Sequence, residues 1–176
     1  DNVSVKEYLG QSVVPESGCG SWLFESQSTN TVTYSEDYSQ WLYGGTAPTL
    51  TYGQLAPDGT YNATKISGVI GNTSLYRNLE SSVTASRSIY ARTVSGTGTA
   101  RLMSYNSNTN NLFTLTEQWQ RFELTGSNSD GGNNFYAADF RGSQTLSEFI
   151  IWGAQSEAGN ISSYIPTEGS TVTRNQ

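Results

Sequence analysis

The segment Phe149-Ile-Ile-Trp-Gly-Ala-Gln-Ser-Glu-Ala-Gly-Asn-Ile-Ser-Ser-Tyr-Ile-Pro-Thr-Glu-Gly-Ser-Thr-Val-Thr-Arg174 decides the fold of this chain. Its opening run of large apolar residues predicts a buried strand. The Gly and Asn residues that follow predict a turn, and the remainder predicts an extended strap. Because no residue in this segment suggests catalysis, we interpret it as framework.

Strand-like runs recur upstream of this segment at the spacing expected of a β-sandwich. Segments rich in Gly, Ser, Asn and Thr separate them, and Ala56-Pro-Asp-Gly59 is a strong turn signal. No window shows sustained helical periodicity. The pattern predicts an all-β fold, an antiparallel two-sheet β-sandwich of the jelly-roll type. The expected strands are roughly Thr60–Ile66, Leu75–Leu79, Ser86–Thr93, Ala100–Asn106, Gln118–Thr125, Asn134–Phe140 and Leu146–Ala154.

The composition indicates a single domain and disfavours some classes of binding partner. The 176 residues suffice for one domain with a full core, and 11 Tyr, 6 Phe and 4 Trp must supply much of its buried area. The formal net charge is −6 and no basic cluster exists, which argues against nucleic acid and anionic membranes as partners. No apolar run reaches the ~20 residues that a membrane-spanning helix needs.

The chain divides near Trp22. Residues 1–21 hold an alternating run, Asp1–Tyr8, that predicts a short strand, and then a linker-like stretch with Pro15 and several glycines. We predict that residues 1–21 belong to, or lead from, a preceding module, and that residues 22–176 form the sandwich. In the alternative, residues 3–8 add a strand to this same sandwich.

Catalytic motifs are missing. The chain has no histidine, which removes Ser-His-Asp and Cys-His catalysis and every His-bound metal site. Glycosidases need two carboxylates that face one cleft, and no strand-like run pairs acidic residues at i, i+2 or i+4. Glu36 and Asp37 are consecutive, so on an extended strand they would face opposite ways. We therefore expect no enzyme activity, with a polysaccharide lyase or hydrolase as a third alternative.

Aromatic and polar residues on one strand face suggest binding instead. In Arg87–Thr93, Ile89 and Ala91 alternate with Ser88, Tyr90 and Arg92. If the first set faces the core, Tyr90 and Arg92 present a ring beside a forked donor on the outer face. A sugar ring can stack its C–H face on such a ring while its hydroxyls hydrogen-bond. Tyr90 and Arg92 are thus the first candidate carbohydrate contacts.

Two further groups are candidates. In Asn134–Arg141, simple alternation places Asp139 and Arg141 on one side with Phe135, and Tyr136 on the other, without deciding which side is buried. The other candidates are Tyr76 and Arg77. For each residue the structural alternative is a tyrosine at the rim of the core, or an Arg–Asp cross-strand pair.

The order of several motifs resembles a family of jelly-roll domains found in phage tail and fibre proteins and beside secreted polysaccharide-degrading enzymes. The matching stretches are Trp22-Leu-Phe-Glu-Ser-Gln-Ser-Thr-Asn30, Thr33-Tyr-Ser-Glu-Asp-Tyr-Ser-Gln-Trp41, Ala56-Pro-Asp-Gly59, Trp119-Gln-Arg-Phe122, Trp152-Gly-Ala-Gln155 and Ser163-Tyr-Ile-Pro-Thr167, and the opening Asp1-Asn-Val-Ser-Val-Lys-Glu7 resembles the end of a neighbouring module.

This resemblance implies a non-catalytic, carbohydrate-binding-module-like domain of an extracellular or virion protein. The expected partners are a polysaccharide or oligosaccharide and neighbouring modules of the same polypeptide. Related modules often hold calcium through an Asp on the last strand. The corresponding stretch here, Ile151–Gln155, lacks it, so a single structural calcium ion is allowed but not placed. The alternative function is a structural spacer or assembly domain of a phage tail or fibre, with no ligand.

Overall fold

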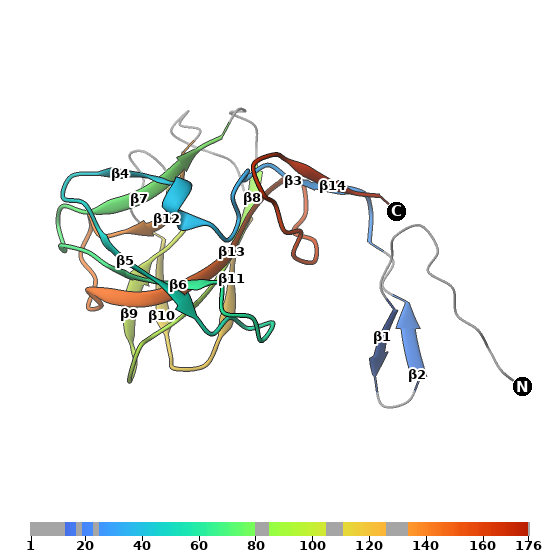
Figure 1. The fold of residues 1–176 in the computed structure, drawn as a ribbon, viewed down its shortest axis with the longest axis horizontal. Coiled ribbons are helices and arrows are strands. Elements are labelled where there is room, and N and C mark those ends of the chain that lie inside the picture. The colour runs from blue at the N-terminus through green and yellow to red at the C-terminus, as the bar shows by residue number, and fades with distance from the viewer. Residues whose placement is uncertain are drawn as a thin grey trace, which may run out of the picture.

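The chain forms a twisted β-sandwich (Figure 1). The computed structural model describes residues 13–16, 19–22, 25–79, 85–104, 111–125 and 134–175. Within these ranges the secondary structure consists of strands and one 3-10 turn, η1 (Tyr38–Gln40). The strands are β1 (Val13–Glu16), β2 (Cys19–Trp22), β3 (Ser28–Asn30), β4 (Leu42–Gly44), β5 (Thr49–Gln54), β6 (Ala63–Ser67), β7 (Ser74–Asn78), β8 (Ala85–Arg92), β9 (Gly98–Arg101), β10 (Leu112–Leu115), β11 (Gln120–Leu124), β12 (Asn134–Asp139), β13 (Glu148–Ala158) and β14 (Val172–Arg174).

Two antiparallel layers make up the sandwich. One is a five-stranded sheet in the order β11-β8-β13-β6-β5, with β13 as its long central strand. The other contains β12-β7-β4, and a bridge between Ser104 and Tyr136 links it to the segment that follows β9. The predicted two-sheet β-sandwich is confirmed, and each strand expected between Thr60 and Ala154 overlaps an observed one. Strands β3, β4, β5, β10 and β14 were not predicted, nor were β1 and β2, which begin in the stretch expected to be a linker.

Alternation along the strands places the core between the layers. On β8, Ile89 and Ala91 are buried in the core, while Tyr90 and Arg92 are partly exposed on the other face. This confirms the sidedness predicted for this strand. Aromatic rings fill much of the interior, as the composition indicated. They include Tyr38, Trp41, Phe135, Phe140 and Phe149.

The last strand, β14, pairs with β3, which places it against the segment that enters the sandwich. β1 and β2 pair only with each other, and Figure 1 shows them apart from the sandwich. The strand expected within residues 1–12 lies outside the described residues. No helix in the described ranges is long and apolar enough to span a membrane.

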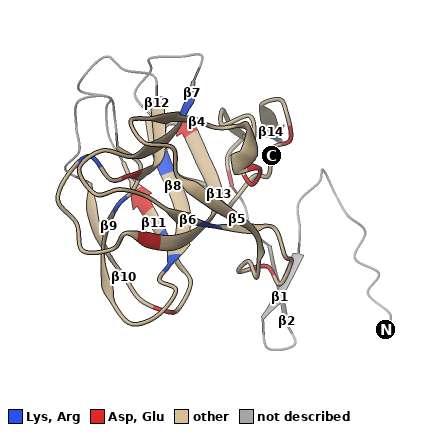
Figure 2. Cartoon of the chain, turned by 60° about the vertical axis from the view of Figure 1, so that its left-hand side comes forward, with Lys and Arg blue, Asp and Glu red and all other residues tan. Residues whose placement is uncertain are grey.

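Charged residues are sparse on this fold. In Figure 2, blue and red segments are scattered, and no group of adjoining strands is uniformly blue. Several basic side chains are held by acidic partners, among them Lys65 by Glu148 and Arg174 by Glu25. The surface therefore offers carboxylates more readily than free cations.

Candidate functional site

A groove of about 770 Å³ opens at one side of the sandwich. Three parts of the chain build it: the segment before η1, the β5–β6 hairpin, and the strap, residues 159–171, which links β13 to β14. We call it the groove. Its lining residues are Tyr34, Glu36, Asp37, Tyr52, Gly53, Tyr61, Asn62, Thr64, Pro166, Thr167, Glu168, Ser170 and Val172.

Exposed tyrosine rings are the main apolar feature of the groove. Tyr61 is 73% exposed and Tyr52 is 51% exposed. Tyr52 is displayed where the β5–β6 pairing shifts register between Thr51 and Gln54, a bulge that locally re-aims the strand. Tyr61 follows the Ala56–Gly59 turn. Large rings left in water beside a cavity are typical of a ligand surface.

A polar network fixes Glu36 at the wall of the groove. Asn62 donates a side-chain hydrogen bond to one carboxylate oxygen, and the Tyr164 hydroxyl donates to the other at 2.9 Å. The Asn62 carbonyl oxygen in turn accepts from the Trp152 indole N–H at 2.9 Å. Burial raises the pKa of Glu36; the Tyr164 hydrogen bond opposes this, and the charge of Asp58 adds to it.

The lining is acidic and rich in hydrogen-bond acceptors. It contains the carboxylates of Glu36, Asp37 and Glu168, and no Lys or Arg is among the lining residues. Burial, and then the negative charge of Asp37, raises the pKa of the Tyr52 hydroxyl. Asp37 therefore acts electrostatically on a ring of the same groove. Glu36 and Asp37 do not lie on an extended strand: Glu36 is in a bend and Asp37 caps η1, and both line the groove.

The first predicted contacts, Tyr90 and Arg92, lie on the outer face of the five-stranded sheet, beside the groove. The Tyr90 ring makes edge contacts with Trp152 and Tyr164, with centroids 5.3 and 6.3 Å away. The Arg92 guanidinium lies 5.3 Å from the Trp119 ring centroid. Because Tyr164 also bonds to Glu36, Tyr90 belongs to a packed cluster that supports the groove wall.

The second group gathers on the other layer. Tyr76 and Tyr136 pack with centroids 5.1 Å apart, and the Arg141 guanidinium lies 4.1 Å from the Tyr136 ring centroid. Arg141 also donates two side-chain hydrogen bonds, at 2.8 and 2.9 Å, to the buried carboxylate of Asp139. The prediction that Tyr136 faces away from Asp139 and Arg141 is wrong, because a register shift between Tyr136 and Ala138 interrupts the alternation.

Arg77 lies apart from both groups. Its Nε and Nη2 donate to the Thr33 hydroxyl at 3.1 and 2.8 Å, and Nη1 donates to the Gln40 carbonyl oxygen. Its guanidinium also lies 4.8 Å from the ring centroid of Tyr34, whose ring lines the groove. The structure thus brings Tyr76, Tyr136, Asp139 and Arg141 together and separates them from Tyr90, Arg92 and Arg77.

Sequence reasoning missed the groove. Its exposed rings lie on β5 and directly after the β5–β6 turn, and β5 has no clear period-2 pattern because Gly53 interrupts it. One signal was present: the Ala56-Pro-Asp-Gly59 turn is followed almost at once by Tyr61-Asn62. A large ring at the tip of a rigid turn is poorly placed for burial, so it could have been marked as a surface feature.

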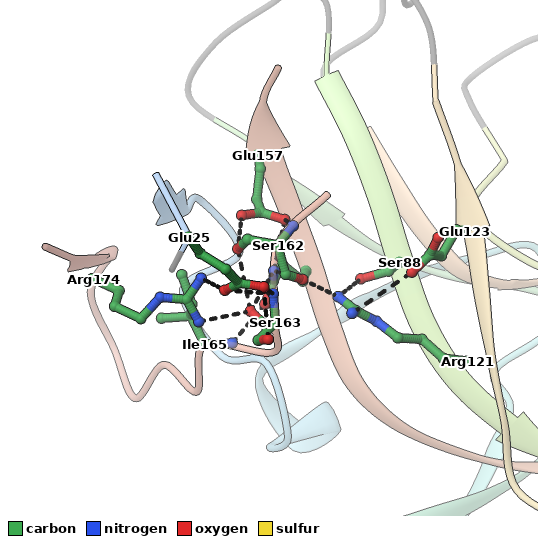
Figure 3. A network of polar contacts seen from close by, with 10 residues as sticks. Glu25, Ser88, Arg121, Glu123, Glu157, Ser162, Ser163, Ile165 and Arg174 are labelled. Atoms are coloured by element: carbon green, nitrogen blue, oxygen red, sulfur yellow. Dashed lines mark hydrogen bonds and ion pairs between the residues drawn. The ribbon is translucent and has the colours of Figure 1, made fainter. Parts of the chain in front are cut away.

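A polar network connects the motifs at the two ends of the domain (Figure 3). Glu25 accepts hydrogen bonds from the Ser163 N–H and hydroxyl and pairs with Arg174. The buried Glu157 accepts from the Ser162 N–H at 3.0 Å and from the Gln155 side chain at 2.7 Å. The motifs at the two ends of the domain are therefore adjacent in space and hold the strap. The C-terminal segment thus has a structural role, and its strap also lines the groove.

Metal ligands are not assembled in the described part of the chain. No group of three or more His, Cys, Asp or Glu side chains there is arranged to hold an ion.

The shape of the sandwich can be compared with solved structures. The C-terminal family 22 carbohydrate-binding module of Clostridium thermocellum xylanase 10B aligns with a TM-score of 0.52 and 14% identity, over 73% of this chain and 89% of that one. This chain has the fold of a carbohydrate-binding module.

Two further structures resemble this carbohydrate-binding-module fold. One is the N-terminal part of Clostridium thermocellum xylanase 10B, comprising a family 22 module and a family 10 glycoside hydrolase module in complex with xylohexaose (TM-score 0.49, 13% identity, 75% of this chain and 28% of that one). The other is tailspike protein 4 of bacteriophage CBA120 (TM-score 0.43, 14% identity, 72% and 21%). No protein-family model matches the sequence, and no curated protein matches it.

Proposed function

We propose that this domain binds a polysaccharide or oligosaccharide without cleaving it, and that the groove is its binding site. The observation that carries the proposal is the placement of Tyr52 and Tyr61: both rings are more than half exposed, and both line one cavity. The carbohydrate-binding-module fold supports it.

The chemistry of the lining suits a sugar. Tyrosine rings present flat faces on which the C–H face of a pyranose can stack. Carboxylates accept hydrogen bonds from sugar hydroxyls, and Asn62 holds Glu36 in place for that role. An open groove buries little of each sugar, so we expect weak binding of short oligosaccharides and useful affinity through multivalency.

Tyr90 and Arg92 remain predicted contacts for a glycan that extends beyond the groove onto the outer face of the five-stranded sheet. In the proposed arrangement Tyr90 chiefly positions Tyr164, and Arg92 offers a donor beside Trp119. The proposed setting is an extracellular enzyme or a phage adhesin, in which neighbouring modules of the same polypeptide supply any catalysis.

Affinity electrophoresis tests the proposal. The domain is run through gels that contain neutral, acidic and amino-sugar polysaccharides, with and without EDTA. We expect retardation by at least one polymer, and Tyr52→Ala and Tyr61→Ala should each weaken it about tenfold, the usual loss of an aromatic anchor worth about 1.4 kcal/mol. The matched control is Tyr43→Ala, because Tyr43 is 57% exposed but lies on β4 and does not line the groove.

Two results would overturn the proposal. Equal mobility in every gel would favour the structural spacer. Retardation that survives both groove substitutions but is lost in Tyr90→Ala, with its fold intact, would move the site to the outer face of the five-stranded sheet. Loss of retardation in EDTA would show that calcium takes part.

A further inference from the structure

The charge of the groove determines which glycans can enter it. We propose that the groove selects glycans that carry no anionic groups and rejects uronates and sulfated sugars by electrostatic repulsion. This inference rests on the proposed function and names the substrate class of the same site.

Three carboxylates surround the space that a sugar would occupy. Glu36 lies on one wall beside Asp37, and Glu168 lies on the strap. Tyr34 forms a β-bridge with Glu168, which ties the strap acid to the segment that carries Glu36 and Asp37. An anionic sugar in the groove would meet negative charge from both sides, and Asp58, which acts on Glu36, adds more.

Two nearby cations are paired with carboxylates. Lys65, next to the lining residue Thr64, pairs with Glu148 at 3.4 Å. Arg174, on the strand of the lining residue Val172, pairs with Glu25. Arg77 lies over the Tyr34 ring and donates to neutral oxygens of Thr33 and Gln40, so it offsets part of the charge of the three groove carboxylates. None of these three is among the residues that line the groove.

The hydrogen-bonding groups match the same ligand. One N–H of the Asn62 amide donates to Glu36, and its carbonyl oxygen accepts from Trp152. The Tyr, Thr and Ser hydroxyls of the lining can donate or accept, whereas its ionised carboxylates only accept. A neutral sugar supplies hydroxyl donors to these carboxylates, whereas a carboxylate or sulfate on the sugar adds acceptors and removes donors. The groove carboxylates therefore disfavour an anionic glycan both by charge and by their lack of donors.

The experiment compares one polymer in two charge states. A neutral glycan retained in the first screen is oxidised at its primary hydroxyls to the corresponding uronate, and both forms are titrated at low and high salt. We expect at least about tenfold weaker binding of the uronate at low salt. Added salt should strengthen uronate binding, because it shortens the Debye length, and should leave neutral-glycan binding nearly unchanged.

Two variants show whether the uronate binds more weakly because the groove carboxylates repel it or because oxidation removes a hydroxyl that contacts the protein. Glu168→Gln should reduce the neutral-to-uronate preference about threefold, the effect of one unit charge several ångströms away in a high-dielectric site. Glu117→Gln, which makes the same charge change outside the groove, should leave the preference unaltered.

The possible outcomes are distinct. If no glycan binds, the proposed function fails and this inference fails with it. If an acidic polymer is the preferred ligand, or if the uronate binds as well as the neutral form at low salt, the domain is still a binding module but this inference is wrong. The inference would also be wrong if the uronate bound more weakly than the neutral form but its affinity changed neither with salt nor in Glu168→Gln.

Discussion

The side-chain oxygen of Gln155 accepts a hydrogen bond from the backbone N–H of Ile165 at 2.6 Å. The same amide donates to Glu157 and to the Ser163 carbonyl oxygen, so one buried side chain on β13 fastens the strap to the outer face of the five-stranded sheet. This explains why Trp-Gly-Ala-Gln and Ser-Tyr-Ile-Pro-Thr occur together in the sequence: the first segment holds the second. Since the strap forms one wall of the groove, the groove depends on this contact.

Replacement of Gln155 by alanine should destabilise the domain by about 2–3 kcal/mol, because it leaves a buried N–H and a buried carbonyl without their partners. Chemical denaturation followed by tryptophan fluorescence measures the change. Gln118→Ala is the control: Gln118 is exposed, so its loss should cost no more than about 0.5 kcal/mol. Equal effects of the two substitutions would mean that Gln155 does not anchor the strap.

Gly153 permits close packing at the β13 bulge. Its φ is +65°, and an added Cβ would lie 3.2 Å from Tyr164 and 3.3 Å from Tyr90. Gly96 has nearly the same φ, +66°, with nothing within 4 Å of such a Cβ. Gly96→Ala should therefore cost only the left-handed strain, about 1 kcal/mol, while Gly153→Ala should cost about 1–2 kcal/mol more.

Thermal or denaturant unfolding gives the unfolding free energy of each glycine variant. The difference between the two variants measures the cost of packing at Gly153, because both substitutions introduce nearly the same backbone strain. Gly153→Ala should also weaken glycan retention by displacing Tyr164, the partner of Glu36. Identical unfolding free energies for the two variants would show that Tyr90 and Tyr164 move to accommodate the added methyl group at no cost in stability.

Asp139 and Arg141 test a predicted sugar contact against a structural pair. Asp139 is fully buried, so Asp139→Ala should destabilise the domain by about 3 kcal/mol, because two side-chain hydrogen bonds between Arg141 and a buried carboxylate are lost. The control is Glu148→Ala, which breaks the exposed pair with Lys65 and should cost about 0.5 kcal/mol. A stable Asp139→Ala protein that no longer binds glycan would instead identify Asp139 as a contact.

Glu36 should make stability depend on pH. Burial raises its pKa above 4.5 in the folded state, so the folded chain takes up the proton more readily than the unfolded chain does. Ionised Glu36 therefore destabilises the fold at neutral pH, and this penalty is relieved as pH falls through the raised pKa toward 4.5. Relative to Glu36→Gln, which cannot titrate, the wild-type domain should gain unfolding free energy on acidification in that window.

Denaturant midpoints of both proteins across that pH range provide the measurement. A wild-type domain that instead loses stability relative to Glu36→Gln on acidification would show that the hydrogen bonds from Tyr164 and Asn62 outweigh burial.

Local patterns determined the fold class and the sidedness of its regular strands. The alternation of Ile89 and Ala91 with Tyr90 and Arg92 is a local property of an extended chain, so it could be predicted and is confirmed. The burial of Phe149 and Ile151 on β13 follows from their large apolar side chains. The absence of histidine and of a basic cluster is also a property of the sequence alone, and it limited the functions to consider.

Tertiary structure decided everything that depends on a register shift or on contacts between distant segments. The shift after Tyr136 could not be predicted, because a bulge is stabilised by the partner strand and not by its own residues. The groove brings Glu36, Tyr61 and Glu168 together from three parts of the chain, and no local pattern encodes that meeting. The sequence alone determined a β-sandwich with an acidic, aromatic-rich composition. Only the packing of the strap against the β5–β6 hairpin gathered its acids and exposed rings into one site, because such long-range contacts form only when the whole core is assembled.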